Sequence, residues 1–150
     1  MKSISKVVGA AALMLASAGA LAGELVVTAA SDAKRGGQTQ VALDIATDGG
    51  VSGISFFLYT GALKAGSVDL SKCVSELPKG FSGTCAQRPD GIGVVAYADG
   101  MANFEAGMVS IGSVAVPVEA ALRKGGLEVR ELVFADVNGE RVESRATVVE

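Results

Sequence analysis

The sequence predicts an all-β protein, a sandwich or barrel of seven or more short strands with almost no helix. Short runs rich in β-branched and aromatic residues recur along the chain, and glycine-rich turn segments such as Asp48-Gly49-Gly50 separate them. Only residues 117–126 have a pattern typical of a helix. A length of 150 residues is enough for one domain with a buried core.

The first 22 residues have the pattern of a secretory signal peptide. Lys2 and Lys6 give a positively charged start, an apolar run over 7–15 follows, and small residues lead to a cleavage site after Ala22. The apolar run is shorter than the roughly 20 residues of a membrane span. The sequence therefore predicts a signal peptide over 1–22, one mature domain over 23–150, and a periplasmic or extracellular location.

The charge of the mature chain limits the partners that we expect. Without Lys2 and Lys6 it keeps 11 basic and 16 acidic residues, a formal net charge of −5, and it has no basic run. Nucleic acids and anionic membrane surfaces are therefore not expected partners. No segment after the leader is apolar enough to predict a membrane span.

Cys73 and Cys85 are the only cysteines of the chain. In an exported protein such a pair predicts a disulfide, which would close a loop of about a dozen residues and stabilise the fold by about 3 kcal/mol. A redox pair usually has C-x-x-C spacing, and a two-thiolate metal site would need histidine or more thiols, whereas the chain has no histidine. We expect a structural disulfide, with no metal and no cofactor.

The expected elements follow from alternation and turn signals. We expect strands over residues 24–30, 38–47, 51–60, 92–98, 108–116, 127–137 and 141–149. Asn138-Gly139 predicts a hairpin between the last two strands. Residues 61–83 are irregular, with a short strand or turn at 68–70, and the predicted disulfide would hold this region in place.

Two other segments complete the expected order of elements. Residues 101–107 are expected to be a surface connection, and residues 117–126 a helix of about two turns with Gly125 as its C-cap.

The strand over 51–60 is the segment around which we expect the fold to be organised. On a period-2 strand Ile54, Phe56 and Leu58 point to one side, and Phe57 and Tyr59 point to the other. Two alternatives remain open, because the second side either packs in the core or meets something outside the domain. In the second case the candidate binding residues are Phe57 and Tyr59, together with Tyr97.

No catalytic set stands out. The usual serine or cysteine nucleophile needs a base, and histidine is absent. Asp90 and Asp99 could act as a carboxylate pair on a glycoside, but both occupy ordinary turn positions. Residues 136–140 resemble the start of a calcium loop, but the glycine stands at the fourth position instead of the sixth, so a hairpin is favoured. The sequence does not predict an enzyme.

The mature chain resembles a cohesin-type domain, and related carbohydrate-binding sandwiches are near neighbours. The likeness rests on the order and spacing of four segments: QTQVALDIA followed by GGVSGISFFLYT, then GIGVVAYADG, FEAGMVSIGSVAV and LVFADVNGERV. It covers about residues 25–149. The resemblance implies an antiparallel, jelly-roll type sandwich of about nine strands, without catalytic activity, whose flat sheet face binds a dockerin or surface ligand in polysaccharide-degrading assemblies.

The predicted function is therefore that of an exported, non-catalytic binding module. Its expected partner is a protein, such as a dockerin-like module, or a polysaccharide, in the context of polysaccharide degradation. The alternative is a structural or adhesive subunit of a cell-surface assembly, joined by strand addition at a sheet edge.

Overall fold

The computed structural model describes residues 22–30 and 37–149 of the chain. Residues 1–21, which hold nearly all of the predicted signal peptide, lie outside the described residues, as does most of the predicted polar turn at 31–37. The described strands are β1 (Gly23–Ala29), β2 (Gln38–Thr47), β3 (Gly53–Tyr59), β4 (Phe81–Arg88), β5 (Gly91–Ala98), β6 (Gly107–Pro117), β7 (Glu128–Ala135), β8 (Arg141–Val142) and β9 (Ser144–Val149).

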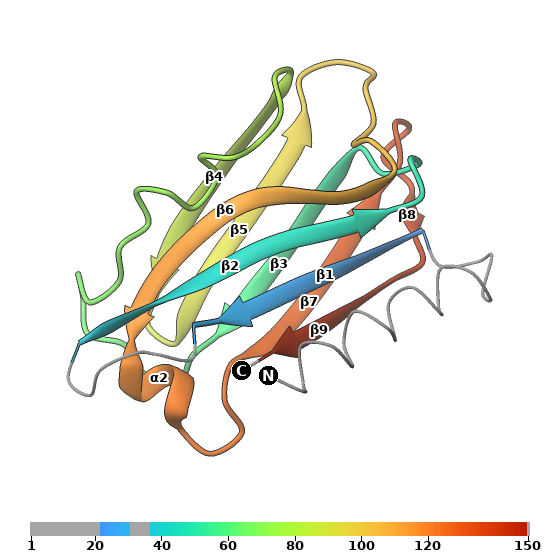
Figure 1. Ribbon diagram of the computed structural model, residues 1–150. Coiled ribbons are helices and arrows are strands. Elements are labelled where there is room, and N and C mark those ends of the chain that lie inside the picture. The colour runs from blue at the N-terminus through green and yellow to red at the C-terminus, as the bar shows by residue number, and fades with distance from the viewer. Residues whose placement is uncertain (1–21, 31–36, 150) are drawn as a thin grey trace.

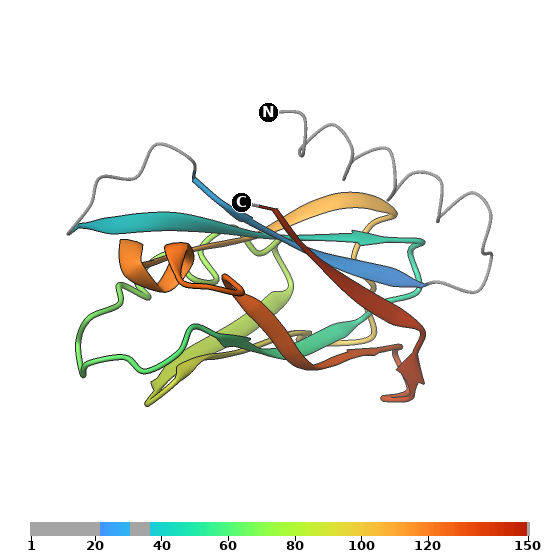
Figure 2. The ribbon, with the colours of Figure 1, turned by 90° about the horizontal axis from the view of Figure 1, so that it is seen from below.

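These nine strands form a two-layer sandwich, which confirms the predicted fold class. Sheet A has the strand order β6-β2-β1-β9, and sheet B has the order β4-β5-β3-β7-β8. Sheet A lies in front of sheet B in Figure 1, and the edge-on view of Figure 2 shows the two layers with α2 at one end. The strand predicted to be central, β3, pairs with β5 on one side and β7 on the other.

The C-terminal segment connects the two sheets. The predicted strand over 141–149 divides at Glu143 into β8, which pairs with β7 in sheet B, and β9, which runs parallel to β1 in sheet A. The other strand pairs are antiparallel. The turn around Asn138-Gly139 is longer than a two-residue hairpin, because the backbone N–H of Asp136 donates to the carbonyl of Glu140.

The core lies between the sheets and follows the predicted period of two. In β2, Val41, Leu43 and Ile45 are completely buried. In β3 the inward residues are Ile54, Phe56 and Leu58, at most 3% exposed. Burial of such apolar side chains provides most of the favourable free energy of folding.

The segment over 101–107 is an exposed connection, as expected, except that Phe104 is a core residue, which the sequence did not predict. Its side chain is 1% exposed and stacks on Phe81, with ring centroids 4.1 Å apart. Its backbone N–H donates to the carbonyl of Val51 at 2.7 Å, which fixes the loop over the end of the sandwich. A single aromatic residue between polar and small neighbours has no periodicity, so the pattern did not indicate its burial.

Strand β4 was not predicted. It is the strand to which the predicted disulfide attaches the loop that precedes it. Cys85 lies in β4 and is bonded to Cys73 in the preceding loop, with an S–S distance of 1.98 Å. The loop is also bonded to β6, because the N–H of Ser113 donates to the carbonyl of Lys72 and the N–H of Glu76 to the carbonyl of Ile111. The predicted short strand at 68–70 is an isolated bridge between Asp69 and Ala115.

One helix is present among the described residues, α2 (Val118–Leu122). It is shorter than predicted, and Gly125 is not its C-cap, since the chain already becomes extended at Arg123. The predicted end was wrong, because the backbone of Arg123 is extended and its side chain lies against Tyr59. In the described part of the chain no helix is long and apolar enough to cross a membrane.

Candidate functional site

The outer face of sheet B carries the three aromatic residues predicted as binding candidates. Phe57 and Tyr59 point away from the core and are half-buried, and Tyr97 on β5 is 48% exposed. The two alternatives left open for β3 are thereby resolved in favour of an outward second side. This face is the first candidate for a contact surface, because exposed apolar side chains of β5 adjoin the half-buried rings of β3.

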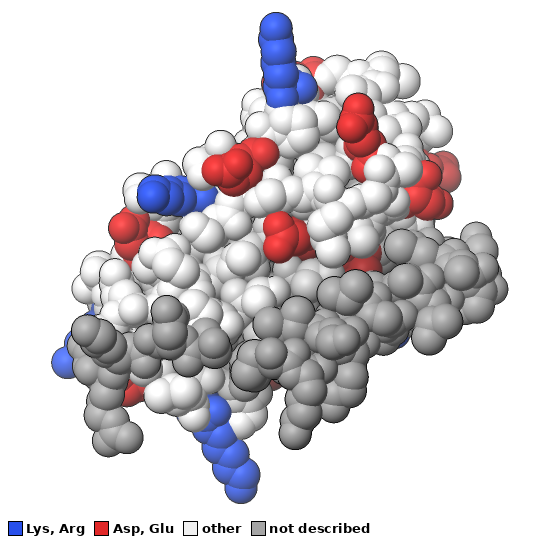
Figure 3. All heavy atoms as spheres, viewed as in Figure 1, with Lys and Arg blue, Asp and Glu red and all other residues white. Residues whose placement is uncertain are grey.

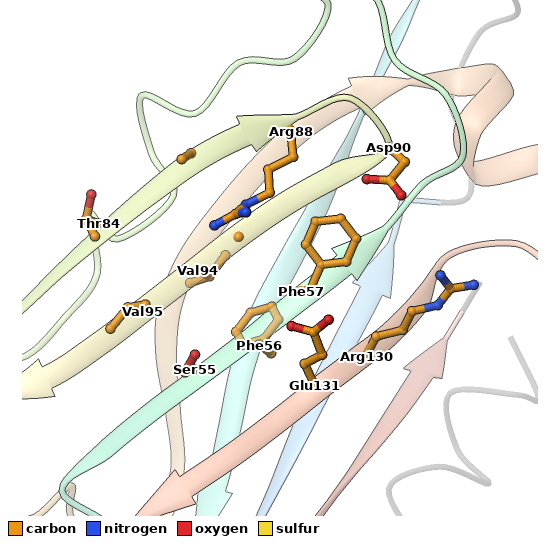
Figure 4. A pocket seen from close by; sticks show the side chains of 12 residues that line it. Ser55, Phe56, Phe57, Thr84, Arg88, Asp90, Val94, Val95, Arg130 and Glu131 are labelled. Carbon is orange, nitrogen blue, oxygen red and sulfur yellow. The ribbon is translucent and has the colours of Figure 1, made fainter.

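A hollow of about 420 Å³ lies in this face, over the middle of β5 (Figure 4). Its lining comes from four adjacent strands and one turn. The lining residues are Ser55, Phe56, Phe57, Thr84, Ala86, Arg88, Asp90, Gly93, Val94, Val95, Arg130 and Glu131.

The hollow exists because β5 has glycine where neighbouring strands have side chains. Gly93 is paired with Phe57 on β3 and with Ala86 on β4. At these three neighbouring positions the only side chains are therefore the ring of Phe57 and the methyl group of Ala86. A Cβ at Gly91 would lie 2.6 Å from the Phe57 ring, which shows that this ring leans over the glycine. The Gly-x-Gly spacing in β5 is a sequence signal that could have indicated the hollow.

Arg88 and Glu131 reach into the hollow from opposite sides, as Figure 4 shows. The guanidinium of Arg88 lies over Gly93, since a Cβ placed there would be 3.4 Å from Nε of Arg88. Among the described residues neither the side chain of Arg88 nor that of Glu131 has a hydrogen bond or ion pair. A positive and a negative group are therefore free to bind polar groups of a ligand on either side of the Phe57 ring.

A bulge in β7 brings Glu131 to this face. The register between β3 and β7 shifts between Ser55 and Phe57, and Glu131 has a φ of 55°. Because one extra residue is inserted at this point, Arg130 and Glu131 both line the hollow, although consecutive strand residues normally face opposite sides. Positive φ is unfavourable for a glutamate, and such strain is often found where a side chain is placed for binding.

Tyr59 is less available than the sequence suggested. The guanidinium of Arg130 lies 3.6 Å from its ring centre, and that of Arg123 lies 4.9 Å from it. Arg130 also donates to a carboxylate oxygen of Glu128 at 3.0 Å. This hydrogen bond lowers the pKa of Glu128 and raises the pKa of Arg130, so both groups are charged at neutral pH.

Tyr97 lies on the same face but away from the hollow. Val95 separates it from Gly93 along β5, and the four-residue step from Gly93 to Tyr97 corresponds to about 13 Å. Val95 and Tyr97 are 39% and 48% exposed. They extend the apolar part of the face beyond the hollow and toward the other end of the sheet.

Two other chemical sites considered in the sequence are not supported by the geometry. Asp90 and Asp99 flank β5 at opposite ends, about 30 Å apart by strand length, which is far too distant for a glycosidase pair. In the turn at 136–140, a carboxylate oxygen of Asp136 accepts hydrogen bonds from the N–H groups of Asn138 and Glu140. The aspartate therefore caps a turn, as the hairpin interpretation required.

The outer face of sheet A has a different character. On the side seen in Figure 3, acidic side chains are scattered over the described surface, and basic ones stand mainly at its margins. Glu24 of β1 accepts hydrogen bonds from Thr147 and Arg145 of β9. Burial raises the pKa of Asp44 in β2, and a hydrogen bond from Ser110 opposes this effect. These groups serve to join neighbouring strands.

Comparison with solved structures identifies the fold. A cohesin module from a family 33 glycoside hydrolase of Clostridium perfringens superposes with a TM-score of 0.58 at 10% identity, over 87% of this chain and 98% of that module. The sixth cohesin of scaffoldin B from Acetivibrio cellulolyticus, solved in complex with a mutant Cel5 dockerin, gives 0.50 at 13% identity, over 84% and 98%.

A third match is a type I cohesin–dockerin complex of Clostridium thermocellum, Coh-OlpA with Doc918. It gives a TM-score of 0.51 at 14% identity and covers 85% of this chain and 98% of that one. No family model matches the sequence, and no curated protein does. The chain has a cohesin-like fold, as its sequence resemblance implied, and the likeness at these identities concerns the fold alone.

Proposed function

We propose that this protein is an exported, non-catalytic binding module that engages a protein partner, of the dockerin-like kind, through the outer face of sheet B. The observation that carries the proposal is the hollow over Gly93, with Phe57 at its centre and unpaired Arg88 and Glu131 on its two sides. Such a combination of apolar centre and unsatisfied polar groups is typical of a recognition surface.

A protein is the favoured partner for two reasons. Two of the structurally similar cohesins were solved in complex with dockerins. In addition, the aromatic residues are poorly placed to stack on a row of sugars, because Arg130 covers Tyr59 and the end of the Phe57 ring leans over Gly91. A role near polysaccharide degradation belongs to the proposal, and it is supported only in that another similar module is part of a glycoside hydrolase.

Export and the lack of catalysis are part of the same proposal. The leader pattern over residues 1–22 supports export, and a disulfide between Cys73 and Cys85 is expected in an oxidising compartment. The groups that line the hollow are suited to hydrogen bonding and ion pairing. Among them there is no nucleophile held next to a base in the arrangement that covalent catalysis needs.

Filling the hollow is expected to weaken binding without unfolding the protein. In Gly93→Leu the new side chain would occupy the space between Phe57 and Arg88, and its nearest neighbour would be the flexible end of Arg88. We expect the affinity for the partner to fall at least about tenfold, which corresponds to about 1.4 kcal/mol. The measurement is calorimetric titration with dockerin modules and with proteins captured by the immobilised domain.

The matched control is Gln40→Leu, which adds an apolar side chain to an exposed position of sheet A. This variant should bind as the unchanged protein does. Equal binding by Gly93→Leu and Gln40→Leu would refute the assignment of the face, and retention of polysaccharides but no protein would refute the class of partner.

A further inference from the structure

Strand β4 forms an open edge of sheet B. It pairs with β5 on one side and is the first strand in the order β4-β5-β3-β7-β8. Its ladder with β5 runs from Phe81–Ala98 to Arg88–Gly91 without a change of register. A regular edge strand exposes a row of backbone donors and acceptors to any strand that can lie beside it.

The hydrogen-bond pattern identifies the backbone groups that face outward. The N–H of Ala98 donates to Ser52 and the N–H of Thr60 donates to Asp90, so even-numbered residues of β5 are bonded to β3. In antiparallel sheets these roles alternate, so odd-numbered residues of β5 are bonded to β4. Their partners in β4 are Ser82, Thr84, Ala86 and Arg88.

The outward groups of β4 are therefore the N–H and C=O of Gly83, Cys85 and Gln87. Within the described part of the chain, none of these backbone groups has a hydrogen-bond partner. The loop at 70–77 contacts β4 from the interior side, where a Cβ at Gly83 would lie 2.8 Å from Val74. This loop makes no backbone hydrogen bonds to the outward groups of Gly83, Cys85 and Gln87, so it does not act as a further strand beside β4.

The features that usually protect an edge are lacking in β4. Its sequence, FSGTCAQR, has no proline and no lysine, and its one charge is Arg88 at the end. Natural edge strands are commonly blunted by such residues or by bulges. The side chains on the outer face are small for most of the strand, so a second strand could lie alongside without steric conflict.

We propose that two copies of this chain associate through their β4 edges, as antiparallel strands related by a two-fold axis at Cys85. In this register Gly83 of one copy is opposite Gln87 of the other, and the outward backbone groups of both strands become paired. The two five-stranded sheets then form one continuous sheet.

Charge complementarity favours a second copy and this register. Arg88 of one copy is opposite Ser82 of the other, and the Ser82 hydroxyl donates to a carboxylate oxygen of Asp99 at 2.5 Å. In the single copy the guanidinium of Arg88 lies over Gly93, so in the dimer it would turn away from the hollow to reach Asp99 across the joined strands. The two-fold axis produces this pair twice, and Glu131 stays in each hollow as a charged group for a ligand. One end of β4 thus carries the positive group, Arg88, and Ser82 near the other end lies beside the negative group, Asp99, which follows β5.

The dimer would present two hollows on one side of a single sheet. Each hollow lies on the outer face and includes Thr84 and Ala86 of β4. The two hollows of the dimer therefore lie next to each other, on either side of the two-fold axis. A partner with two binding segments could then occupy both sites, and its overall affinity would rise through effective concentration. Because the strand interface is small, we expect the free dimer to form only at high protein concentration.

The test is the mass of the purified protein, with its disulfide oxidised, by sedimentation equilibrium over micromolar to millimolar concentrations. We expect the unchanged protein to shift from one to two copies. Gln87→Pro removes an outward N–H without removing a bond to β5, a change that edge strands tolerate, and should remain monomeric. Gln87→Ala loses the same side-chain bond to the carbonyl of Lys64 but keeps the N–H, and should still dimerise.

A charge exchange provides a second test if Gln87→Pro does not fold. Arg88→Glu and Asp99→Arg should each weaken the dimer at least about tenfold, and the double variant should restore it. A monomer at all concentrations would overturn the proposal, as would equal dimerisation of Gln87→Pro and Gln87→Ala or of Arg88→Glu and the unchanged protein. Because no other partner is present in these measurements, their failure would leave the proposed binding function untouched.

Discussion

Replacing Phe104 with alanine is expected to lower the free energy of unfolding by about 3–5 kcal/mol. The ring is 1% exposed and stacks on Phe81, so its removal leaves a cavity that a loop residue cannot refill. Such a loss is large, because the free energy of unfolding of a whole domain is usually only about 5–15 kcal/mol. Chemical denaturation followed by circular dichroism measures the change.

The same loop supplies a control for this prediction. Met101 is 77% exposed, so Met101→Ala should change the free energy of unfolding by less than about 0.5 kcal/mol. If both variants lose little stability, Phe104 does not contribute to the core, contrary to its burial in the structure.

Removing the disulfide is expected to lower the free energy of unfolding by about 3 kcal/mol. Cys73 and Cys85 are separated by 12 residues, and the bridge restricts the unfolded chain by closing that loop. The folded loop should stay in place, because Lys72 and Glu76 are bonded to β6 through their backbones. The variant is Cys73→Ala with Cys85→Ala, since Cys73 is buried and a serine hydroxyl there would lack a partner.

Reduction of the unchanged protein provides the comparison. Its thermal midpoint should fall to that of the double alanine variant, and the far-ultraviolet spectra of the two folded proteins should match. A loss well below about 1 kcal/mol would show that the loop is already restricted in the unfolded chain, contrary to the loop-closure argument.

The sequence was a good guide wherever one pattern dominated. Alternation in β2 and β3 identified both strands and the inward set of Ile54, Phe56 and Leu58. It also placed Phe57 and Tyr59 together on the other side, although it could not decide whether that side was covered. That decision depends on how many layers pack together, which is a property of the whole chain.

Strand β4 was missed because its environment differs from that of the other strands. Of its inward positions, Gly83 and Cys85 pack against the loop at 70–77, and the side chain of Gln87 donates to the carbonyl of Lys64. No apolar alternation is therefore required of it. β4 is a strand because its backbone pairs with β5, and the sequence FSGTCAQR has no local pattern that indicates this pairing.

The hollow was also missed, although its aromatic residue was singled out. Asp90 was interpreted as part of an ordinary turn, and it does lie in the turn between β4 and β5, next to Arg88 at the end of β4. Their presence beside Glu131 depends on the bulge in β7, which strand periodicity alone does not predict. The missing side chain at Gly93 was the one local signal.

The outer face of sheet B is proposed to be the surface that binds a protein partner. The most direct test is to titrate the isotopically labelled protein with a captured partner or dockerin module and to map the perturbed backbone amides by NMR. We predict that the largest changes centre on Phe57, Gly93 and Val95, while the outward residues Gln40 and Ser113 of sheet A stay unchanged. Changes centred on sheet A, with those of β3 and β5 unaffected, would contradict the claim.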